Sequence, residues 1–420
     1  MGVNNALNYS PVFPCHAADY PEAMELSATT FGYCTNVHAN ASLEKTRANL
    51  EMHALGVKRR ISPQEPMGIG LWLSAQAAQE LVQSGQVEAF AAWLRNIGLV
   101  PFTMNGFPYG DFHEQVVKHK VYQPTWWEPA RLEYTLQLAE ILNSLLPPGV
   151  EGSISTLPIS WPKSAASQQD PTGKGPLLPL DEGLLNASAA QLRRVAAEFA
   201  ALEARTGRLI YLCIEPEPGC VLDTADDLVS FFHDYLLPDG DEHPIRRHLR
   251  ICHDICHSAV MFEDQQEAVR KYAAAGIEIG KVQVSSAVGV DFESLPASER
   301  QSALDMLRAK FVEPRYLHQT SVCDHGQTTL YEDLPLAVAQ ARPSGRWRTH
   351  FHVPIYWEGS SPFQTFRDQI PPCIQAVLKY SSCRHFEVET YAWGVLPPEL
   401  QHAELAEGIA QEMEWFRSVV

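Results

Sequence analysis

Apolar runs that suit strands alternate with stretches of helical periodicity along the chain, from about residue 29 to the end. Eight runs are short and mostly apolar, which is the pattern of strands buried on both faces of a sheet. They cover residues 31–38, 67–74, 99–107, 152–160, 209–218, 249–257, 281–287 and 385–393. Eight stretches with helical spacing cover residues 43–55, 76–97, 129–146, 188–205, 223–236, 264–275, 298–311 and 403–416. This alternation predicts an α/β fold, a parallel (β/α)8 TIM barrel formed by one domain of residues 1–420.

Local signals place several helix boundaries. Ser188 can cap the helix at 188–205, because a serine side chain accepts backbone hydrogen bonds in the first turn. Gly207 can end the same helix in the left-handed conformation. Gly85 interrupts the helical pattern of residues 76–97 and predicts a break there.

Two regions interrupt the alternation. Residues 161–183 are rich in proline, glycine and serine, and they predict an extended loop on the catalytic face of the barrel or an insertion without a role in the site. The second region, about residues 312–357, lies between the seventh and eighth strands. Residues 316–322 and 348–357 resemble added strands, and Asp324-His325-Gly326 resembles the turn of a hairpin. We therefore predict an inserted β-hairpin region there.

The composition restricts the partners. Of 420 residues, 45% are hydrophobic and 20% are charged, so the chain can bury a large core. It has 50 acidic and 32 basic residues, and the net charge of −18 disfavours nucleic acid and anionic membrane surfaces. A small phosphorylated substrate held by a local basic group is still compatible with this charge.

Nothing in the sequence predicts export or membrane insertion. The N-terminal residues MGVNNALNYSPVF lack the basic region and apolar run of a signal peptide, and no apolar run reaches the length of a membrane span. The nine cysteines have no regular spacing. Cys252 and Cys256 lack a second close cysteine pair, so buried free thiols are a better interpretation than a metal site. We expect a cytoplasmic, reduced protein.

Polar residues follow or end the last four predicted strands. Glu215 follows the fifth strand, Asp254 and His257 end the sixth, Gln283 lies in the seventh, and Glu389 ends the eighth. The carboxyl ends of barrel strands meet at one face, so we expect these side chains to converge. An oxygen-rich set of this kind suits a divalent cation such as Mn, Mg, Co or Zn. We predict that Glu215, Asp254, Gln283 and Glu389 bind it.

Further polar residues fall at the same predicted rim and could contact a substrate. The candidates are Asn36, His38, Asn105, His113, His257, His318 and His352. Alternation along a strand places His350 and His352 on one face, and we favour His352 because Pro354 then turns the chain. The aromatic-rich segments 107–113 and 120–129 could form the walls of a substrate pocket or pack over the barrel top.

The order Glu, Asp-x-x-His, Gln, Glu on the last four strands resembles the xylose isomerase-like barrel superfamily of sugar isomerases and epimerases. YCTNVH, NGFPYGDFH, VYQPTW, LHQTSV, HFHVPI and EVETYAWGVLP, which span Tyr33 to Pro397, resemble the metabolite traffic protein EboE family. The resemblance implies that Glu215 and Glu389 bind the metal and act as an acid/base pair. A histidine commonly occupies the position of Gln283 in the superfamily, and His352 could supply the missing imidazole.

Two functional hypotheses follow. The first is a metal-dependent isomerase or epimerase of a polyhydroxy carbonyl compound, in which the cation stabilises an enediolate and His257 holds a substrate hydroxyl. The second is a metabolite-binding or handover protein without catalysis, because one barrel fold supports many functions. We favour the enzyme, in a secondary-metabolite trafficking context. A small metabolite, a second copy of the chain, or proteins of the same gene cluster are the expected partners. The net charge argues against the DNA-binding endonuclease branch of the superfamily.

Overall fold

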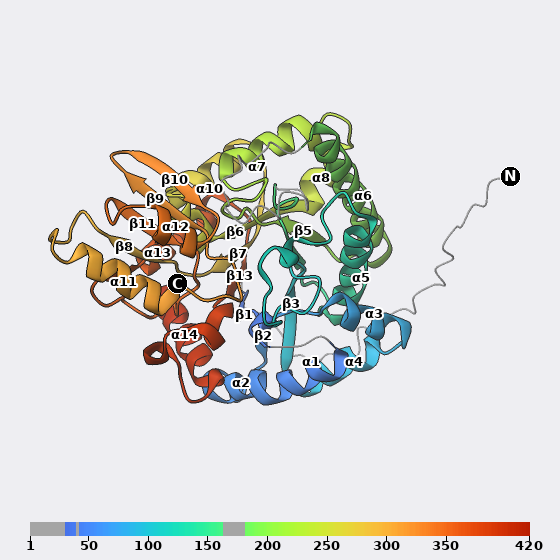
Figure 1. The fold of residues 1–420 in the computed structure, drawn as a ribbon. Helices are drawn as coiled ribbons and strands as arrows, with labels where there is room; N and C mark the ends of the chain where they lie inside the picture. Colours follow the sequence, from blue (N-terminus) through green and yellow to red (C-terminus); the bar gives the residue numbers. More distant parts are fainter. Residues whose placement is uncertain (1–29, 39–41, 163–180) are drawn as a thin grey trace.

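Eight parallel strands form a nearly closed barrel, as the alternation predicted (Figure 1). The computed structural model describes residues 30–38, 42–162 and 181–420 of the chain. The barrel strands are β1 (Thr30–Tyr33), β2 (Met67–Leu71), β3 (Leu99–Asn105), β4 (Gly152–Thr156), β5 (Ile210–Ile214), β6 (Leu249–Asp254), β7 (Ile279–Val284) and β13 (His385–Val388). β13 pairs with both β7 and β1, and a single parallel bridge between Cys34 and Gly70 joins the β1 side to β2.

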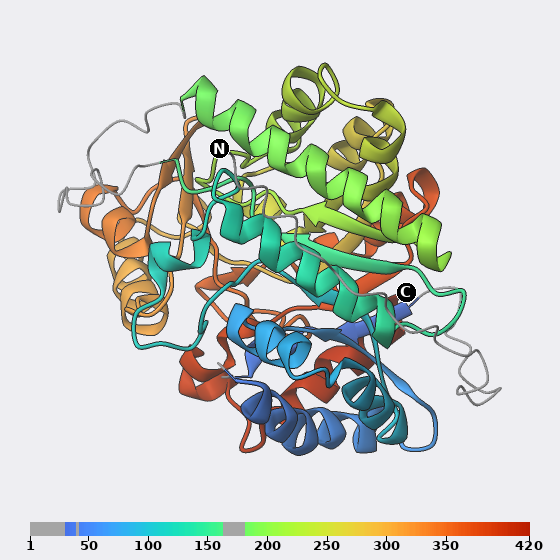
Figure 2. The same ribbon diagram turned by 90° about the vertical axis from the view of Figure 1, so that its right-hand side faces the viewer.

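Helices surround the barrel. They are α1 (Leu43–Asn49), α2 (Leu55–Ile61), α3 (Ala75–Gln83), α4 (Val87–Asn96), α5 (Pro129–Leu145), α6 (Glu182–Thr206), α7 (Ala225–Phe231), α8 (Glu242–His248), α9 (Ile255–Val260), α10 (Gln265–Ala274), α13 (Ile370–Tyr380) and α14 (Leu405–Val419). α5 and α6 lie side by side on the outside (Figure 2). Within the described ranges, no helix is both long and apolar enough to cross a membrane.

The helix boundaries agree with the sequence at the glycines and differ elsewhere. Gly85 separates α3 from α4, and Gly207 ends α6 with a φ of 71°. The cap expected at Ser188 is wrong, because α6 begins earlier and Asp181 accepts the backbone N–H of Gly183. Ser188 instead lies inside the helix and donates to the carbonyl oxygen of Leu184. The loop predicted for 161–183 lies mostly outside the described residues.

The sixth strand is shorter than predicted. β6 ends at Asp254, and its side chain caps the next helix by accepting the backbone N–H of His257 at 2.9 Å. Residues 255–257 therefore belong to α9 and not to the strand. His257 consequently lies in the first helical turn, above the end of the barrel.

The region between β7 and β13 is larger than the predicted hairpin (Figure 1). It holds a five-stranded antiparallel sheet in the order β10-β9-β11-β8-β12. Its strands and helices are β8 (Val288–Asp291), α11 (Arg300–Phe311), β9 (Thr320–Asp324), β10 (Gln327–Tyr331), α12 (Leu334–Gln340), β11 (Arg346–Thr349) and β12 (Phe363–Thr365). The strand predicted at 348–357 therefore ends at Thr349, and His350 and His352 follow it. We call residues 288–365 the inserted sheet.

The inserted sheet has its own core. The fully buried Trp347 packs edge-on against Phe292 with ring centroids 5.3 Å apart. Phe311 of α11 packs against Phe351 and Phe363. α11, predicted as a barrel helix, thus covers the inserted sheet, and α13 takes the place beside α10 in the outer ring.

The barrel interior holds a buried ion pair. Lys281 Nζ lies 2.6 Å from Glu387 Oε2, and neither side chain is exposed to solvent. Gly70 provides the space for this carboxylate, because a Cβ atom there would lie 1.2 Å from Glu387 Oε1. Charged groups therefore extend from the barrel centre toward the carboxyl ends of its strands.

Candidate active site

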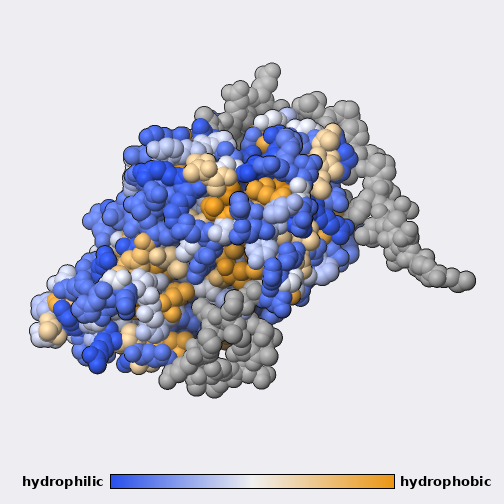
Figure 3. Space-filling model, turned by 90° about the horizontal axis from the view of Figure 1, so that it is seen from above, coloured by the Kyte–Doolittle hydropathy of each residue, from blue (hydrophilic) through white to orange (hydrophobic). Residues whose placement is uncertain are grey.

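A cavity opens above the carboxyl ends of the barrel strands. Its polar lining includes Asn36, Asn105, Lys118, Glu215, Glu217, His257, His350, His352 and Glu389. Aromatic residues form much of the remaining wall, namely Phe107, Phe112, Tyr122, Tyr316 and Tyr391. The two predicted aromatic segments thus supply Phe107, Phe112 and Tyr122. Seen from above, the described surface is largely hydrophilic, with hydrophobic residues gathered in patches near its middle (Figure 3).

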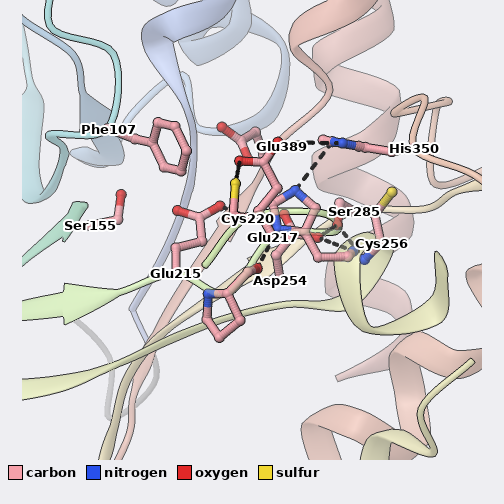
Figure 4. A network of polar contacts seen from close by, with 12 residues as sticks. Phe107, Ser155, Glu215, Glu217, Cys220, Asp254, Cys256, Ser285, His350 and Glu389 are labelled. Atoms are coloured by element: carbon pink, nitrogen blue, oxygen red, sulfur yellow. Dashed lines mark hydrogen bonds and ion pairs between the residues drawn. The ribbon is translucent and has the colours of Figure 1, made fainter. Parts of the chain in front are cut away.

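Three carboxylates meet at the base of this cavity, where Glu215 and Glu389 line it and Asp254 lies next to them (Figure 4). Glu215 directly follows β5, and its N–H donates to the carbonyl oxygen of Thr156 on β4. Asp254 ends β6, and Glu389 directly follows β13, where its N–H donates to the carbonyl oxygen of Val284. Each offers an oxygen within 4.8 Å of the other two. Because parallel strands of a barrel end at one face, three residues distant in sequence form a single cluster.

The free atoms of this cluster fit a divalent cation. Asp254 Oδ1 accepts the Ser285 hydroxyl at 2.8 Å and the His257 N–H at 2.9 Å, whereas Oδ2 is buried with no hydrogen-bond partner in the described chain. Glu215 Oε2 and both polar side-chain atoms of Gln283 are likewise buried and unpartnered. Carboxylate and amide oxygens are the donors that hard cations prefer, and buried polar atoms without partners are costly otherwise.

His352 adds an imidazole to these oxygens. Its Nδ1 lies 2.7 Å from the carbonyl oxygen of Glu389. A carbonyl oxygen only accepts, so Nδ1 carries the hydrogen and the lone pair is on Nε2. That Nε2 is buried and unpartnered, and lies 3.9 Å from Asp254 Oδ2. The inserted sheet thus brings a nitrogen donor to a site where β7 supplies the amide of Gln283.

Burial and mutual repulsion perturb the carboxyl groups. Burial, followed by the charges of Glu389 and Asp254, raises the pKa of Glu215 well above its usual value. Burial, followed by Asp254 and Glu387, raises the pKa of Glu389 to about 8. Lys281 acts in the opposite direction on both groups. A divalent cation among the three carboxylates would relieve the same repulsion and favour their charged forms.

Two asparagines hold Glu389 in place. The side-chain amides of Asn36 and Asn105 donate to Glu389 Oε1 at 2.7 and 3.1 Å. His113 Nε2 lies 2.6 Å from the carbonyl oxygen of Asn36 and supports the turn that carries it. Four of the expected substrate-contact residues therefore line the cavity, namely Asn36, Asn105, His257 and His352. His113 is not among the lining residues and contacts Asn36 instead.

His38 and His318 are not among the residues that line the cavity, although both were candidates for substrate contact. His38 Nε2 lies 3.0 Å from the Tyr33 hydroxyl, and its ring stacks on His53. His318 bonds to Glu313 Oε1 at 2.7 Å and to the carbonyl oxygen of His350 at 2.8 Å. Local partners therefore hold both rings outside the cavity lining, although His38 Nδ1 is buried with no hydrogen-bond partner in the described chain.

Sequence reasoning did not assign Glu217 or His350. Glu217 Oε1 accepts the Tyr122 hydroxyl at 2.7 Å and the Gln319 amide at 3.0 Å. Both residues lie two positions from an assigned one, Glu217 from Glu215 and His350 from His352. Residues two apart in an extended segment share a face, so this spacing was the available signal.

Comparison with solved structures shows the xylose isomerase-like TIM barrel fold. A xylose isomerase-like TIM barrel protein from Mycobacterium smegmatis, in complex with magnesium, matches over 94% of this chain and 98% of its own, with a TM-score of 0.50 and 12% identity. The IolI protein with a bound zinc atom covers 93% and 98%, with a TM-score of 0.47 and 12% identity. The probable 3-DHS dehydratase AsbF from Bacillus anthracis covers 92% and 98%, with a TM-score of 0.45 and 16% identity. No protein-family model and no curated protein sequence matches the chain.

Proposed function

We propose that the protein is a metal-dependent isomerase or epimerase that acts on a small polyhydroxy carbonyl metabolite. The observation that carries this proposal is the convergence of Glu215, Asp254 and Glu389 at one end of the barrel, beside a cavity that Glu215 and Glu389 line. Gln283 and His352 complete the proposed donor set.

A divalent cation bound there would polarise the carbonyl and hydroxyl oxygens of a substrate and stabilise an enediolate. Glu215 approaches the cavity from β5 and Glu389 from β13, so the two can act on different sides of a substrate carbon. One carboxylate removes a proton and the other returns it. The two asparagine amides hold Glu389 Oε1, which leaves Oε2 as the atom that exchanges the proton.

The aromatic wall would exclude water from this reaction and contact the apolar part of a substrate. Tyr391 packs between His352 and Phe112, with ring centroids 4.7 and 5.4 Å away. Lys118 also lines the cavity, but its amine pairs with Asp333. The lining therefore suits a polyol or a cyclic polyol better than a sugar phosphate.

The proposed biological context rests on the motifs that resemble the metabolite traffic protein EboE. In that context the substrate is a secondary metabolite or its precursor, handled in the cytoplasm. A second copy of the chain or another protein of the same gene cluster would be the macromolecular partner.

A handover protein without catalysis is the second candidate. Gln283 favours it, because an amide is a weaker ligand than the imidazole common at this position and a loosely held cation would be a poor catalyst. In this case the cavity binds the metabolite and releases it unchanged.

Solvent exchange distinguishes the two candidates without knowledge of the product. Metal-loaded protein is incubated in deuterated water with ketoses, aldoses and cyclitol precursors, and deuterium is sought at carbons next to the carbonyl. An enzyme should incorporate deuterium, and Glu215→Gln and Glu389→Gln should each slow incorporation by about 10²- to 10⁴-fold. Ligand-induced stabilisation without exchange in any compound would instead support the handover protein.

A further inference from the structure

Two buried histidines face each other beside the three-carboxylate cluster. His257 is in the first turn of α9, and His350 directly follows β11 of the inserted sheet. Their rings are nearly perpendicular, with an interplanar angle of 81° and centroids 4.5 Å apart. The two Nε2 atoms are 3.2 Å apart. Both side chains are almost completely buried, with exposed fractions of 7% and 6%.

The other nitrogen of each ring is already committed as a donor. His257 Nδ1 lies 2.9 Å from the carbonyl oxygen of Pro216, which can only accept. His350 Nδ1 lies 2.7 Å from Gln319 Oε1. The orientation of that amide follows from its other end, since Gln319 Nε2 donates to Glu217 Oε1. A neutral imidazole with its hydrogen on Nδ1 has a lone pair on Nε2, so two lone pairs face each other.

Two facing lone pairs at this separation require a positive species between them. A tetrahedral zinc ion bound by two imidazoles at about 2.0–2.1 Å sets their nitrogens about 3.3–3.4 Å apart, close to the observed distance. Glu217 supplies a third donor, because one of its oxygens lies within 4.8 Å of a ring nitrogen of each histidine. Nδ1 bonds to oxygen acceptors are also the usual way in which proteins orient metal-binding imidazoles.

We propose that Glu217, His257 and His350 form a second divalent cation site, which differs in chemistry from the site of Glu215, Asp254 and Glu389. Two nitrogens and one carboxylate favour zinc or cobalt, whereas the oxygen-rich cluster accepts magnesium or manganese. Glu215 and Glu389 of the first site line the same cavity as the three residues of the second, so a substrate could bridge the two sites. His257 would then act on a substrate hydroxyl through the cation and not directly.

The inserted sheet gains a role from this proposal. Glu217 and His257 come from segments that follow β5 and β6, whereas His350 and Gln319 come from the inserted sheet. The backbone of the sheet also joins the two residues, because the His350 N–H donates to the Gln319 carbonyl oxygen at 2.8 Å. The second cation site therefore exists only where the sheet docks on the barrel.

Cobalt binding tests the proposal without any substrate. The full chain is stripped with a chelator, loaded with cobalt at neutral pH, and analysed for bound metal and for its visible absorption, which is strong when nitrogen ligands surround cobalt at low coordination number. The wild type should bind two ions per chain. His350→Gln and Glu217→Gln should each bind one ion and lose the strong visible band. Glu389→Gln should lose the other ion and keep the band.

His248→Gln is the matched control, because His248 is a buried histidine that lies before β6, at the opposite end of the barrel. It should bind two ions, as the wild type does. A wild type that binds a single ion, which Glu389→Gln abolishes, would overturn the proposal and assign the contact between the two rings to a shared proton. Two ions retained in both His350→Gln and Glu217→Gln would overturn it as well. These results would leave the function proposed for the three-carboxylate cluster intact.

Discussion

Removing Glu389 from the metal-free protein should change the way its stability depends on pH. The folded protein raises the pKa of Glu389 from 4.5 to about 8, so between these values the folded state keeps a proton that the unfolded chain has released. The free energy of unfolding then falls by about 1.4 kcal/mol per pH unit for each such group. From pH 6.5 to 8, Glu389 alone lowers the free energy of unfolding by about 2 kcal/mol, and Glu389→Gln should remove this part of the pH dependence.

The pH range matters because buried histidines act in the opposite direction. His352, with its pKa lowered to about 4, is neutral when folded, so it makes the protein more stable as the pH rises toward 6.5. Half of the unfolded-state imidazoles are still protonated at pH 6.5, so this contribution becomes constant only about one pH unit higher. Asp223, whose pKa is raised to about 8, shares the sign of Glu389. The test therefore compares the pH dependence of the unfolding free energy between Glu389→Gln and the wild type. The slope of the wild type alone also contains the contributions of other groups.

Denaturant unfolding at four pH values between 6.5 and 8, after treatment with a chelator, measures this difference. Glu414→Gln is the control, because this glutamate is exposed. Saturating manganese should flatten the wild-type curve, since a cation that replaces the proton binds more tightly as the pH rises. Equal slopes for the wild type and Glu389→Gln would refute the reasoning, because they would mean that Glu389 is ionised without a metal.

Three further changes test the supports of the site. Lys281→Met should cost about 3–5 kcal/mol of unfolding free energy, because it leaves Glu387 buried without its partner. Adding Glu387→Gln should recover most of that loss. Additive losses in a double-mutant cycle measured by denaturation would contradict this prediction. Gly70→Ala should cost about 1–3 kcal/mol because its Cβ meets Glu387, whereas Gly110→Ala, with nothing within 4 Å, should be neutral. Glu412→Ala removes the acceptor for the Ile355 N–H and for the hydroxyl of Thr390, which directly follows Glu389 in the chain. Because such outer contacts orient metal ligands, the affinity of the carboxylate cluster for a divalent cation, measured by titration, should be about 10- to 100-fold weaker.

The carboxylate cluster could be predicted from the sequence because it depends only on fold class. Once eight apolar runs alternate with helices, the residues at their carboxyl ends must share one face. Glu215, Asp254 and Glu389 follow from this rule, whatever the details of the loops. Asp254 illustrates its limit, since the same residue also caps α9 and thereby removes His257 from the strand.

The inserted sheet could not be predicted to the same extent. Only three residues separate the end of β7 at Val284 from the start of β8 at Val288, so the two runs merge in the sequence and only one strand was expected. The roles of the histidines depend on partners that no periodicity reveals. His318 turns to Glu313, whereas His350 turns to Gln319, although both lie beside strands of the same sheet.

The proposed donors are divided between the barrel and the inserted sheet. The strand ends contribute carboxylates and one amide, and the imidazoles of His350 and His352 enter from the sheet side of the cavity. His352 Nε2 lies 3.9 Å from Asp254 Oδ2, so an imidazole of the inserted sheet reaches the carboxylates of the strand ends. Gln283 offers an amide from β7, and His257 of α9 is the one proposed nitrogen donor that comes from the barrel side. In this arrangement, the docking of the inserted sheet on the barrel determines whether the proposed donor set is complete.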